Sequence, residues 1–120
     1  MENRELKFRS WDSKNKEMDF WDVNNIPMFK TENIMQFTGF KDCNGVEIYE
    51  GDTMIDVDVI LEKNVKLEDT KQQVYWCNKL GCWKLDNTFT QNKESGYLLA
   101  NDLKDFRFKV VGNIYENVLS

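Results

Sequence analysis

The stretch MQFTGFKDCNGVEIYEGD, residues 35–52, holds the strongest turn signals of the chain. Asn44-Gly45 is the dipeptide that best tolerates the positive φ angles of a two-residue type I′ hairpin turn. With a loop of two residues, Phe40 lies opposite Tyr49 as an aromatic cross-strand pair. Gly51-Asp52 marks a second turn. The stretch therefore predicts a β-hairpin followed at once by a reversal of the chain.

The segment after this reversal, TMIDVDVILE, alternates between apolar and acidic side chains. Ile55, Val57 and Val59 fall on one face of a strand, while Asp56 and Asp58 fall on the other. Two carboxylates on one face can bind a hard cation or perform acid–base chemistry. They can equally be the solvated side of a half-buried strand, and alternation alone explains them.

The segment before the opening stretch predicts an N-terminal hairpin. In RELKFRSWD, Leu6 and Phe8 face one way, and Arg9 and Trp11 face the other. A polar run, DSKNK, separates this strand from a second one in EMDFWDV. Pro27 is the single proline and has no N–H for a sheet ladder, so we expect a loop or an edge segment around it.

The second half of the chain predicts further short elements. QQVYWCNKLGCWKLDN suggests a strand, a turn with Gly81 in a positive-φ position, and a second strand. Leu98, Leu99 and Leu103 lie at helical spacing, which allows one short helix. FRFKVVGNIYENV predicts a strand that has a bulge at Gly112 and continues through Ile114. Residues 62–71 and 86–95 are polar and are expected to be surface loops.

These elements add up to about seven short strands and at most one short helix in a single domain of 120 residues. Short strands with frequent turn signals are typical of a small barrel or a sandwich. The hydrophobic fraction of 41% and the aromatic fraction of 13% supply enough material for one core. The fold class is therefore mainly β.

Charge and cysteine usage limit the class of partner. The chain has 21 acidic and 16 basic residues and no basic block, which argues against binding to a nucleic-acid backbone. It has no apolar run long enough to span a membrane and no apolar leader segment. Three cysteines, Cys43, Cys77 and Cys82, suggest reduced thiols in a cytosol.

The sequence contains few of the residues that common chemistries need. It has no histidine, which removes the usual general base and the commonest zinc ligand. It has no phosphate-cradling glycine motif, so no cofactor and no small-molecule ligand is indicated. The spacing of Cys77 and Cys82 fits no common zinc pair, and we expect thiols packed beside Trp76 and Trp83.

Four tryptophans are many for a chain of this size. Exposed tryptophans mark a partner surface, whereas buried ones fill a small core. Trp11 is the best candidate for exposure because it points away from Leu6 and Phe8. The candidate partner surface comprises Trp11, Trp21, Trp76 and Trp83.

Three segments together resemble the YopX family of phage and prophage proteins: RELKFRSWDSKNKEM, MQFTGFKDCNGVEIYEGD and FKVVGNIYEN. The resemblance implies a small SH3-like barrel of short antiparallel strands with an N-terminal β-hairpin extension. It assigns residues 1–32 to the extension and residues 33–120 to the barrel core. It also implies a gene of a phage or prophage and a protein that acts in the cytoplasm of a bacterial host.

The resemblance brings no catalytic residue with it. The matching positions suit turns, caps and packing; the principal ones are Asn44, Gly45, Tyr49, Gly51, Asp52, Gly112, Asn113 and Tyr115. We therefore expect a non-enzymatic accessory protein that binds a protein partner or assembles with itself. The alternatives are a nucleic-acid-associated regulator of phage DNA metabolism and a small metal enzyme that uses carboxylates such as Asp56 and Asp58.

Overall fold

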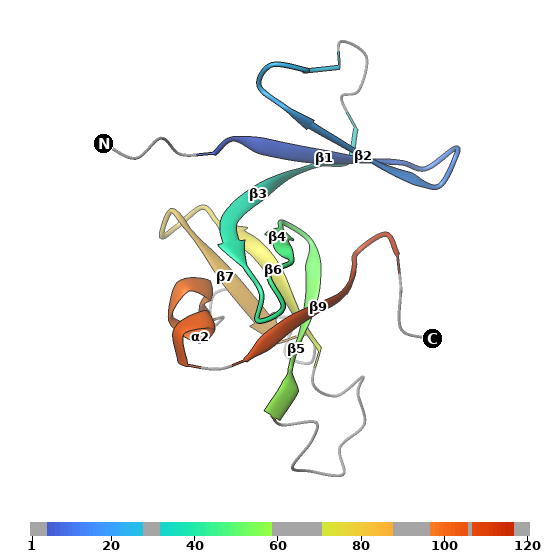
Figure 1. The fold of residues 1–120 in the computed structure, drawn as a ribbon. Helices are drawn as coiled ribbons and strands as arrows, with labels where there is room; N and C mark the ends of the chain where they lie inside the picture. Colours follow the sequence, from blue (N-terminus) through green and yellow to red (C-terminus); the bar gives the residue numbers. More distant parts are fainter. Residues whose placement is uncertain (1–4, 28–31, 59–70, 88–96, 106, 117–120) are drawn as a thin grey trace.

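The computed structural model describes residues 5–27, 32–58, 71–87, 97–105 and 107–116 (Figure 1). These residues form nine strands and one complete helix. In chain order the elements are β1 (Lys7–Asp12), β2 (Glu17–Asp22), β3 (Ile34–Lys41), β4 (Glu47–Tyr49), β5 (Asp52–Asp56), β6 (Gln72–Cys77), β7 (Cys82–Asn87), β8 (Tyr97–Leu98), α2 (Leu99–Asp105) and β9 (Phe108–Asn113).

The strands form two antiparallel sheets. The first has the order β2-β1-β3-β4 and the second has the order β8-β7-β6-β5-β9. β3 starts beside the β1–β2 hairpin and bends down towards the second sheet, so the hairpin stands above the small half-barrel (Figure 1). The predicted fold class is confirmed, with more strands than the seven that the sequence suggested.

One apolar core lies inside the half-barrel. Its buried members are Ile48, Met54, Val74, Trp83, Leu85, Leu99 and Phe108. Leu99 is fully buried and Leu103 packs against the same cluster, so the predicted short helix is confirmed and its apolar side covers the core. Leu98, the third leucine of the predicted helix, instead ends β8. Complete burial of one such leucine contributes about 1.5–3 kcal/mol.

The β3–β4 hairpin has the predicted tip but a different turn. Gly45 has a φ of +82°, whereas Asn44 does not adopt a positive φ, so the turn is not of type I′. The Asp42 carboxylate accepts hydrogen bonds from the backbone N–H groups of Asn44 (2.8 Å) and Val46 (2.9 Å). This side chain closes a loop of five residues, 42–46, in place of the two-residue loop.

The longer loop changes the register of the hairpin, and the predicted pairing of Phe40 with Tyr49 is wrong. Tyr49 pairs with Phe37, and the register shifts before Lys41 pairs with Glu47. Gly39 lies inside this irregular part of β3 with a φ of +91°. A bulge of this kind bends a strand, as β3 is bent in Figure 1.

The chain reverses at Gly51, as predicted, and Gly51 has a φ of +86°. The strand that follows is shorter than expected, because β5 ends at Asp56. There the Asp56 carboxylate accepts a hydrogen bond from the backbone N–H of Asp58 (3.0 Å), which turns the chain out of the sheet. The prediction that Asp56 and Asp58 share one strand face is therefore wrong.

Burial along β5 also departs from strict alternation. The neighbouring side chains of Met54 and Ile55 are both buried. β5 lies between β6 and β9 in the second sheet, so it is not an edge strand.

The remaining predicted strands and turns are present, although β1 begins only at Lys7 and β9 only at Phe108. β1 and β2 form the N-terminal hairpin, and Gly81, with a φ of +64°, lies in the β6–β7 turn. β9 contains the expected bulge, because Thr53 pairs with Gly112 and Met54 pairs with Val110. β9 ends at Asn113, one residue before the predicted end.

The predicted polar loop at 62–71 lies outside the described residues except for Lys71. The loop predicted at 86–95 is wrong in its described part, because Asp86 and Asn87 are the last residues of β7 and Asp86 is buried. Within the described part of the chain, no helix is long and apolar enough to cross a membrane.

Candidate functional site

The N-terminal hairpin and the half-barrel enclose a cleft of about 360 Å³, here called the hairpin cleft. The hairpin, the segment around β4, the start of β5 and the edge strand β9 all contribute to it. The lining residues are Arg9, Phe20, Val46, Glu47, Tyr49, Asp52, Val110, Val111, Gly112 and Asn113. Its walls therefore come from both sheets.

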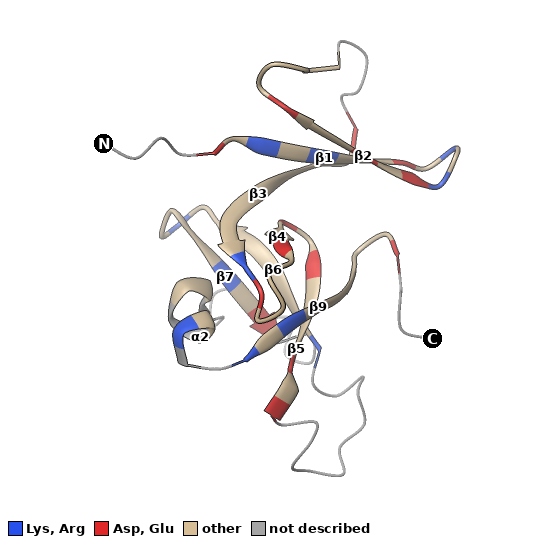
Figure 2. Cartoon of the chain, viewed as in Figure 1, with Lys and Arg blue, Asp and Glu red and all other residues tan. Residues whose placement is uncertain are grey.

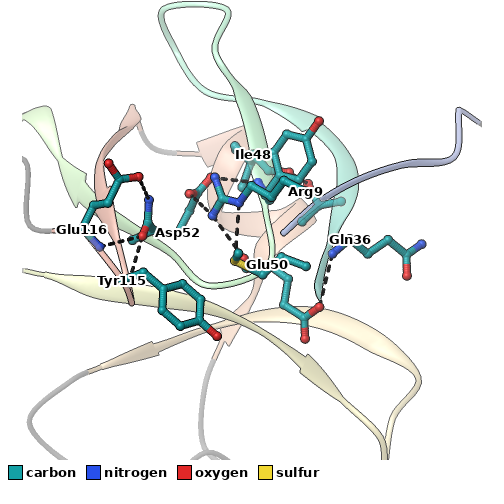
Figure 3. Close-up of polar contacts among 11 residues, drawn as sticks. Arg9, Gln36, Ile48, Glu50, Asp52, Tyr115 and Glu116 are labelled. Atoms are coloured by element: carbon teal, nitrogen blue, oxygen red, sulfur yellow. Dashed lines mark hydrogen bonds and ion pairs between the residues drawn. The ribbon is translucent and has the colours of Figure 1, made fainter. Parts of the chain in front are cut away.

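A buried ion pair lies at the base of the hairpin cleft. Arg9 is 6% exposed and Asp52 is 1% exposed, and Arg9 Nη2 lies 2.7 Å from Asp52 Oδ1. The second oxygen of Asp52 accepts a hydrogen bond from the backbone N–H of Tyr49 (2.8 Å). Arg9 Nη2 also donates to the backbone carbonyl of Glu50 (3.3 Å), as Figure 3 shows.

The pairing of β1 with its neighbours places Arg9 at this position. β1 is an inner strand of the first sheet, where Arg9 pairs with Phe20 on β2 and with Met35 on β3. Its guanidinium lies 4.9 Å from the centroid of the Tyr49 ring, which is a cation–π contact. The face of β1 that carries Arg9 is therefore turned towards the half-barrel.

Burial decides the ionisation behaviour of the base of the cleft. Burial raises the pKa of the Asp52 carboxyl above its ordinary value, and the charge of Arg9 and the N–H of Tyr49 offset only part of this effect. Burial also raises the pKa of the Tyr49 hydroxyl. Because both carboxylate oxygens of Asp52 already have donors, the pair serves to hold the hairpin on the barrel.

The rim of the hairpin cleft is apolar and exposed. Phe20 on β2 is 64% exposed and Val46 before β4 is 50% exposed. The rings of Phe20 and Tyr49 form a T-shaped contact, with 5.7 Å between ring centroids. The arrangement offers apolar contact above a polar base whose groups are already paired.

The four tryptophans do not share one surface. Trp11 and Trp21 belong to the hairpin, and both are half-buried. Trp11, the expected candidate for exposure, stacks on Tyr115 with 5.9 Å between ring centroids. In the second sheet Trp76 is 39% exposed, while Trp83 beside it is buried. A role of these side chains in partner binding stays a prediction.

The glycine and asparagine positions singled out in the sequence serve turns and close contacts. A Cβ atom on Gly51 would lie 3.3 Å from Ile114 and from the sulfur of Met35. Asn113 Oδ1 accepts hydrogen bonds from the backbone N–H groups of Tyr115 (2.9 Å) and Glu116 (2.8 Å). These residues fix the segment that follows the edge of the hairpin cleft.

Tyr115 ties that segment to the start of β3. Its hydroxyl donates a hydrogen bond to Asn33 Oδ1 (3.1 Å). Gly112 lines the hairpin cleft itself, together with Asn113, so these two members of the predicted motif reach the site along with Tyr49 and Asp52. Asn44 and Gly45, at the β3–β4 tip, are not among its lining residues.

The cysteines lie at two separate places. Cys77 and Cys82 pair in register across the β6–β7 turn, with Cys77 buried and Cys82 half-buried. Cys43 is exposed at the β3–β4 tip. In the described ranges, no three residues of the metal-ligating types lie close enough to hold an ion. Asp58 pairs with Arg107.

The residues of the hairpin cleft that sequence patterns did not identify include Arg9, Phe20 and Val46. Arg9 lies on the strand face that carries Lys7 and Trp11, and the alternation places this face opposite the apolar face of Leu6 and Phe8. Its partner, Asp52, is 43 residues away in the chain. The only available signal was the turn at Gly51-Asp52, and it does not identify a partner.

Comparison with protein families agrees with the resemblance in the sequence. The family model described as YopX protein matches residues 22–119. The comparison with curated proteins found no match. Two of the three segments that carried the resemblance lie within the matched range, while β1 and most of β2 precede it. Because the match covers most of the chain, this protein belongs to the YopX family.

Proposed function

We propose that this protein is a non-catalytic accessory protein of a phage or prophage, and that it binds a protein partner at the hairpin cleft in the cytoplasm of a bacterial host. The observation that carries the proposal is the exposed apolar rim formed by Phe20 and Val46. Exposed apolar and aromatic side chains around a concave surface are typical of protein-binding sites.

The base of the cleft supports binding in preference to catalysis. Arg9 and Asp52 are paired with each other, and both carboxylate oxygens of Asp52 accept hydrogen bonds. A general acid or base needs a proton position that faces the substrate, and the contacts of this pair are all within the protein. Apolar contact at the rim is what remains to bind a ligand.

The cleft also offers little to a nucleic-acid backbone. Among its described lining residues, Arg9 is the only basic side chain, and it is buried beside Asp52. Binding to phosphates needs exposed lysine or arginine side chains. A protein surface with apolar side chains fits this cleft better than a strand of DNA or RNA.

Substitution of the rim tests the proposal. Phe20→Ser and Val46→Ser remove apolar surface from the hairpin cleft, while Leu80→Ser is the matched control. Leu80 is 62% exposed in the β6–β7 turn, in the other sheet. Each variant is immobilised, exposed to lysate of the bacterial host, and the captured proteins are identified; light scattering on the purified protein shows whether the partner is a second copy.

The expected result is a protein that wild type and Leu80→Ser retain and that both rim variants lose. Thermal unfolding of all four proteins checks that the rim variants remain folded. If only Leu80→Ser fails to capture the partner, the binding surface lies at the β6–β7 turn and the proposal is wrong. Equal capture by all variants would contradict the assignment to the hairpin cleft.

A further inference from the structure

A second cleft, of about 230 Å³, lies between the β3–β4 tip and the junction of α2 with β9. We call it the basic cleft. It shares no lining residue with the hairpin cleft, and its lining comes from three separate segments of the chain. The lining residues are Lys41, Asp42, Cys43, Leu103, Lys104, Arg107 and Phe108.

Three positively charged side chains meet at the basic cleft, although the chain as a whole has a net charge of −5. Lys41 and Lys104 are exposed, and neither forms an ion pair with any residue that the structure describes. Figure 2 shows the basic residues (blue) at the end of β3, on α2 and at the start of β9, around the same part of the barrel.

Arg107 is already paired with a carboxylate of the protein, that of Asp58. Its Nε lies 3.2 and 3.3 Å from the two carboxylate oxygens of Asp58, and its Nη2 contacts Oδ1. Both side chains are largely exposed, so an ion pair at this position is weak and can be exchanged. The guanidinium is therefore available to a ligand that offers more charge than one carboxylate.

The one acid in the described lining does not oppose such a ligand strongly. Asp42 is buried, and its carboxylate accepts hydrogen bonds from three backbone N–H groups, those of Asn44, Val46 and Val110. These hydrogen bonds stabilise its charge and direct its lone pairs into the β3–β4 loop and towards β9. The described lining therefore presents the charges of Lys41 and Lys104, together with that of Arg107, which Asp58 shares.

We propose that the basic cleft binds a dianionic phosphate group, as in inorganic phosphate or a nucleoside monophosphate. Two lysines act as point charges and an arginine supplies a planar fork of donors, a combination suited to a dianionic phosphate. A carboxylate carries only one charge, and a single basic side chain is enough to pair with it, as in the Asp58–Arg107 pair. A site with three basic side chains is better matched to a phosphate. The site is independent of the protein-binding function proposed for the hairpin cleft.

This inference departs from the sequence analysis, which indicated no small-molecule ligand. That expectation depended on the absence of a contiguous phosphate-binding motif. The basic cleft has no such motif, because Lys41 ends β3, Lys104 lies in the last turn of α2 and Arg107 precedes β9. The three bases meet only in the folded chain.

Two-dimensional ¹H–¹⁵N NMR titration tests the site. Inorganic phosphate, a nucleoside monophosphate and a single-stranded oligonucleotide are added in separate experiments at equal phosphate concentration and low salt. The expected result is a set of saturable shifts at the amides of Cys43, Lys104 and Arg107. Inorganic phosphate and the monophosphate should saturate at lower concentrations than the oligonucleotide, because each backbone phosphodiester carries only one charge. The reverse order would contradict a site for a dianionic phosphate. Absence of saturable shifts at these amides with all three additives would overturn the proposal.

Matched variants show whether the bases of the cleft hold the ligand. Lys41→Gln/Lys104→Gln should weaken the affinity by about tenfold, the effect of two exposed charge contacts. The control Lys14→Gln/Lys79→Gln makes the same change in net charge at two other turns, where both lysines are exposed. An equal loss in both double variants would mean that only net charge matters, and would contradict a site.

A gain of affinity provides the second test. Asp58→Asn frees Arg107 of its carboxylate and should tighten phosphate binding several-fold, while Glu32→Gln, which alters the same net charge beside the start of β3, should not. Unchanged or weaker binding by Asp58→Asn would show that Arg107 does not contribute.

Discussion

Arg9 on β1 and Asp52 on β5 form a buried ion pair 2.7 Å long that joins the N-terminal hairpin to the half-barrel. The two residues come from different sheets and are 43 positions apart in the chain. Arg9 also reaches the Glu50 carbonyl and the Tyr49 ring. The pair holds the hairpin, and therefore Phe20, above the cleft to which we assign partner binding.

Substitution of one partner of this pair should lower the free energy of unfolding much more than substitution of both. Asp52→Leu leaves the Arg9 guanidinium buried without a counter-charge and should lower the free energy of unfolding by about 3–5 kcal/mol. The double variant Arg9→Met/Asp52→Leu should lose less than this single variant, because no unpaired charge remains. Urea unfolding of wild type, both single variants and the double variant measures the coupling. If the two single effects simply add, the pair does not act as a unit.

The pKa values of Asp52 and Asp58 should be shifted in opposite directions from the ordinary value of aspartate. Burial raises the pKa of Asp52, whereas the neighbouring Arg107 lowers the pKa of Asp58. Carboxyl ¹³C shifts measured against pH should therefore place the midpoint of Asp52 above that of Asp58. The reverse order would show that Arg9 outweighs burial at the base of the hairpin cleft.

These two shifts have opposite consequences for stability. At pH values just above 3.8, the ordinary pKa of aspartate, the carboxyl group of Asp52 stays protonated in the folded protein while it ionises in the unfolded chain. Its ionisation therefore reduces the free energy of unfolding as pH rises through its folded pKa. The contribution of Asp58 is lost instead as pH falls below 3.8. As the pH decreases below about 4, the free energy of unfolding of Asp58→Asn should therefore fall less than that of wild type.

Gly51→Ala should destabilise the protein more than Gly45→Ala. Both glycines have a similar φ, +86° and +82°, so an alanine at either position costs about 1–2 kcal/mol of backbone strain. Only at Gly51 would the new Cβ also crowd Ile114 and Met35, because nothing lies within 4 Å of it at Gly45. Chemical unfolding of the two variants measures the difference. Equal losses would show that the neighbours of Gly51 yield without cost.

Asp42→Ala should have a large effect for a residue in a loop. It leaves three backbone N–H groups without their acceptor, including that of Val110 on β9, and we expect a loss of roughly 2–4 kcal/mol. Asp22→Ala, whose carboxylate accepts from the backbone N–H of Asn24 in an exposed turn, is the control and should lose under about 1 kcal/mol. Thermal unfolding compares the two variants, and a similar loss in both would contradict the role of Asp42 as a link between the β3–β4 loop and β9.

Local signals in the sequence predicted the turns and short elements of this fold. Gly45, Gly51 and Gly81 lie in turns with positive φ, as their neighbours in sequence indicated. Leu99 and Leu103 marked the short helix because helical spacing brings both to one side. In each case, the determining interactions lie within a few residues, so the sequence pattern contains them.

Side-chain interactions that the apolar pattern does not reveal, both local and between distant segments, explain what the sequence did not predict. The register of the β3–β4 hairpin depends on the Asp42 carboxylate, which bonds to backbone groups of its own loop and of β9. The early end of β5 depends on the Asp56 side chain and not on hydrophobic alternation. Arg9 looked like a solvent-facing strand residue, because nothing near it in the chain identifies Asp52 as its partner.

Site-specific photo-cross-linking tests the central claim most directly, namely that the hairpin cleft is the surface that binds a protein partner. A photoreactive phenylalanine analogue is placed at Phe20 in one variant and at Leu80 in another, because both positions are highly exposed. After irradiation in host lysate, the proposal predicts one dominant cross-linked protein from position 20, lost when excess unlabelled wild type is added, and none from position 80. No competed product at position 20, or the same product at both positions, would contradict it.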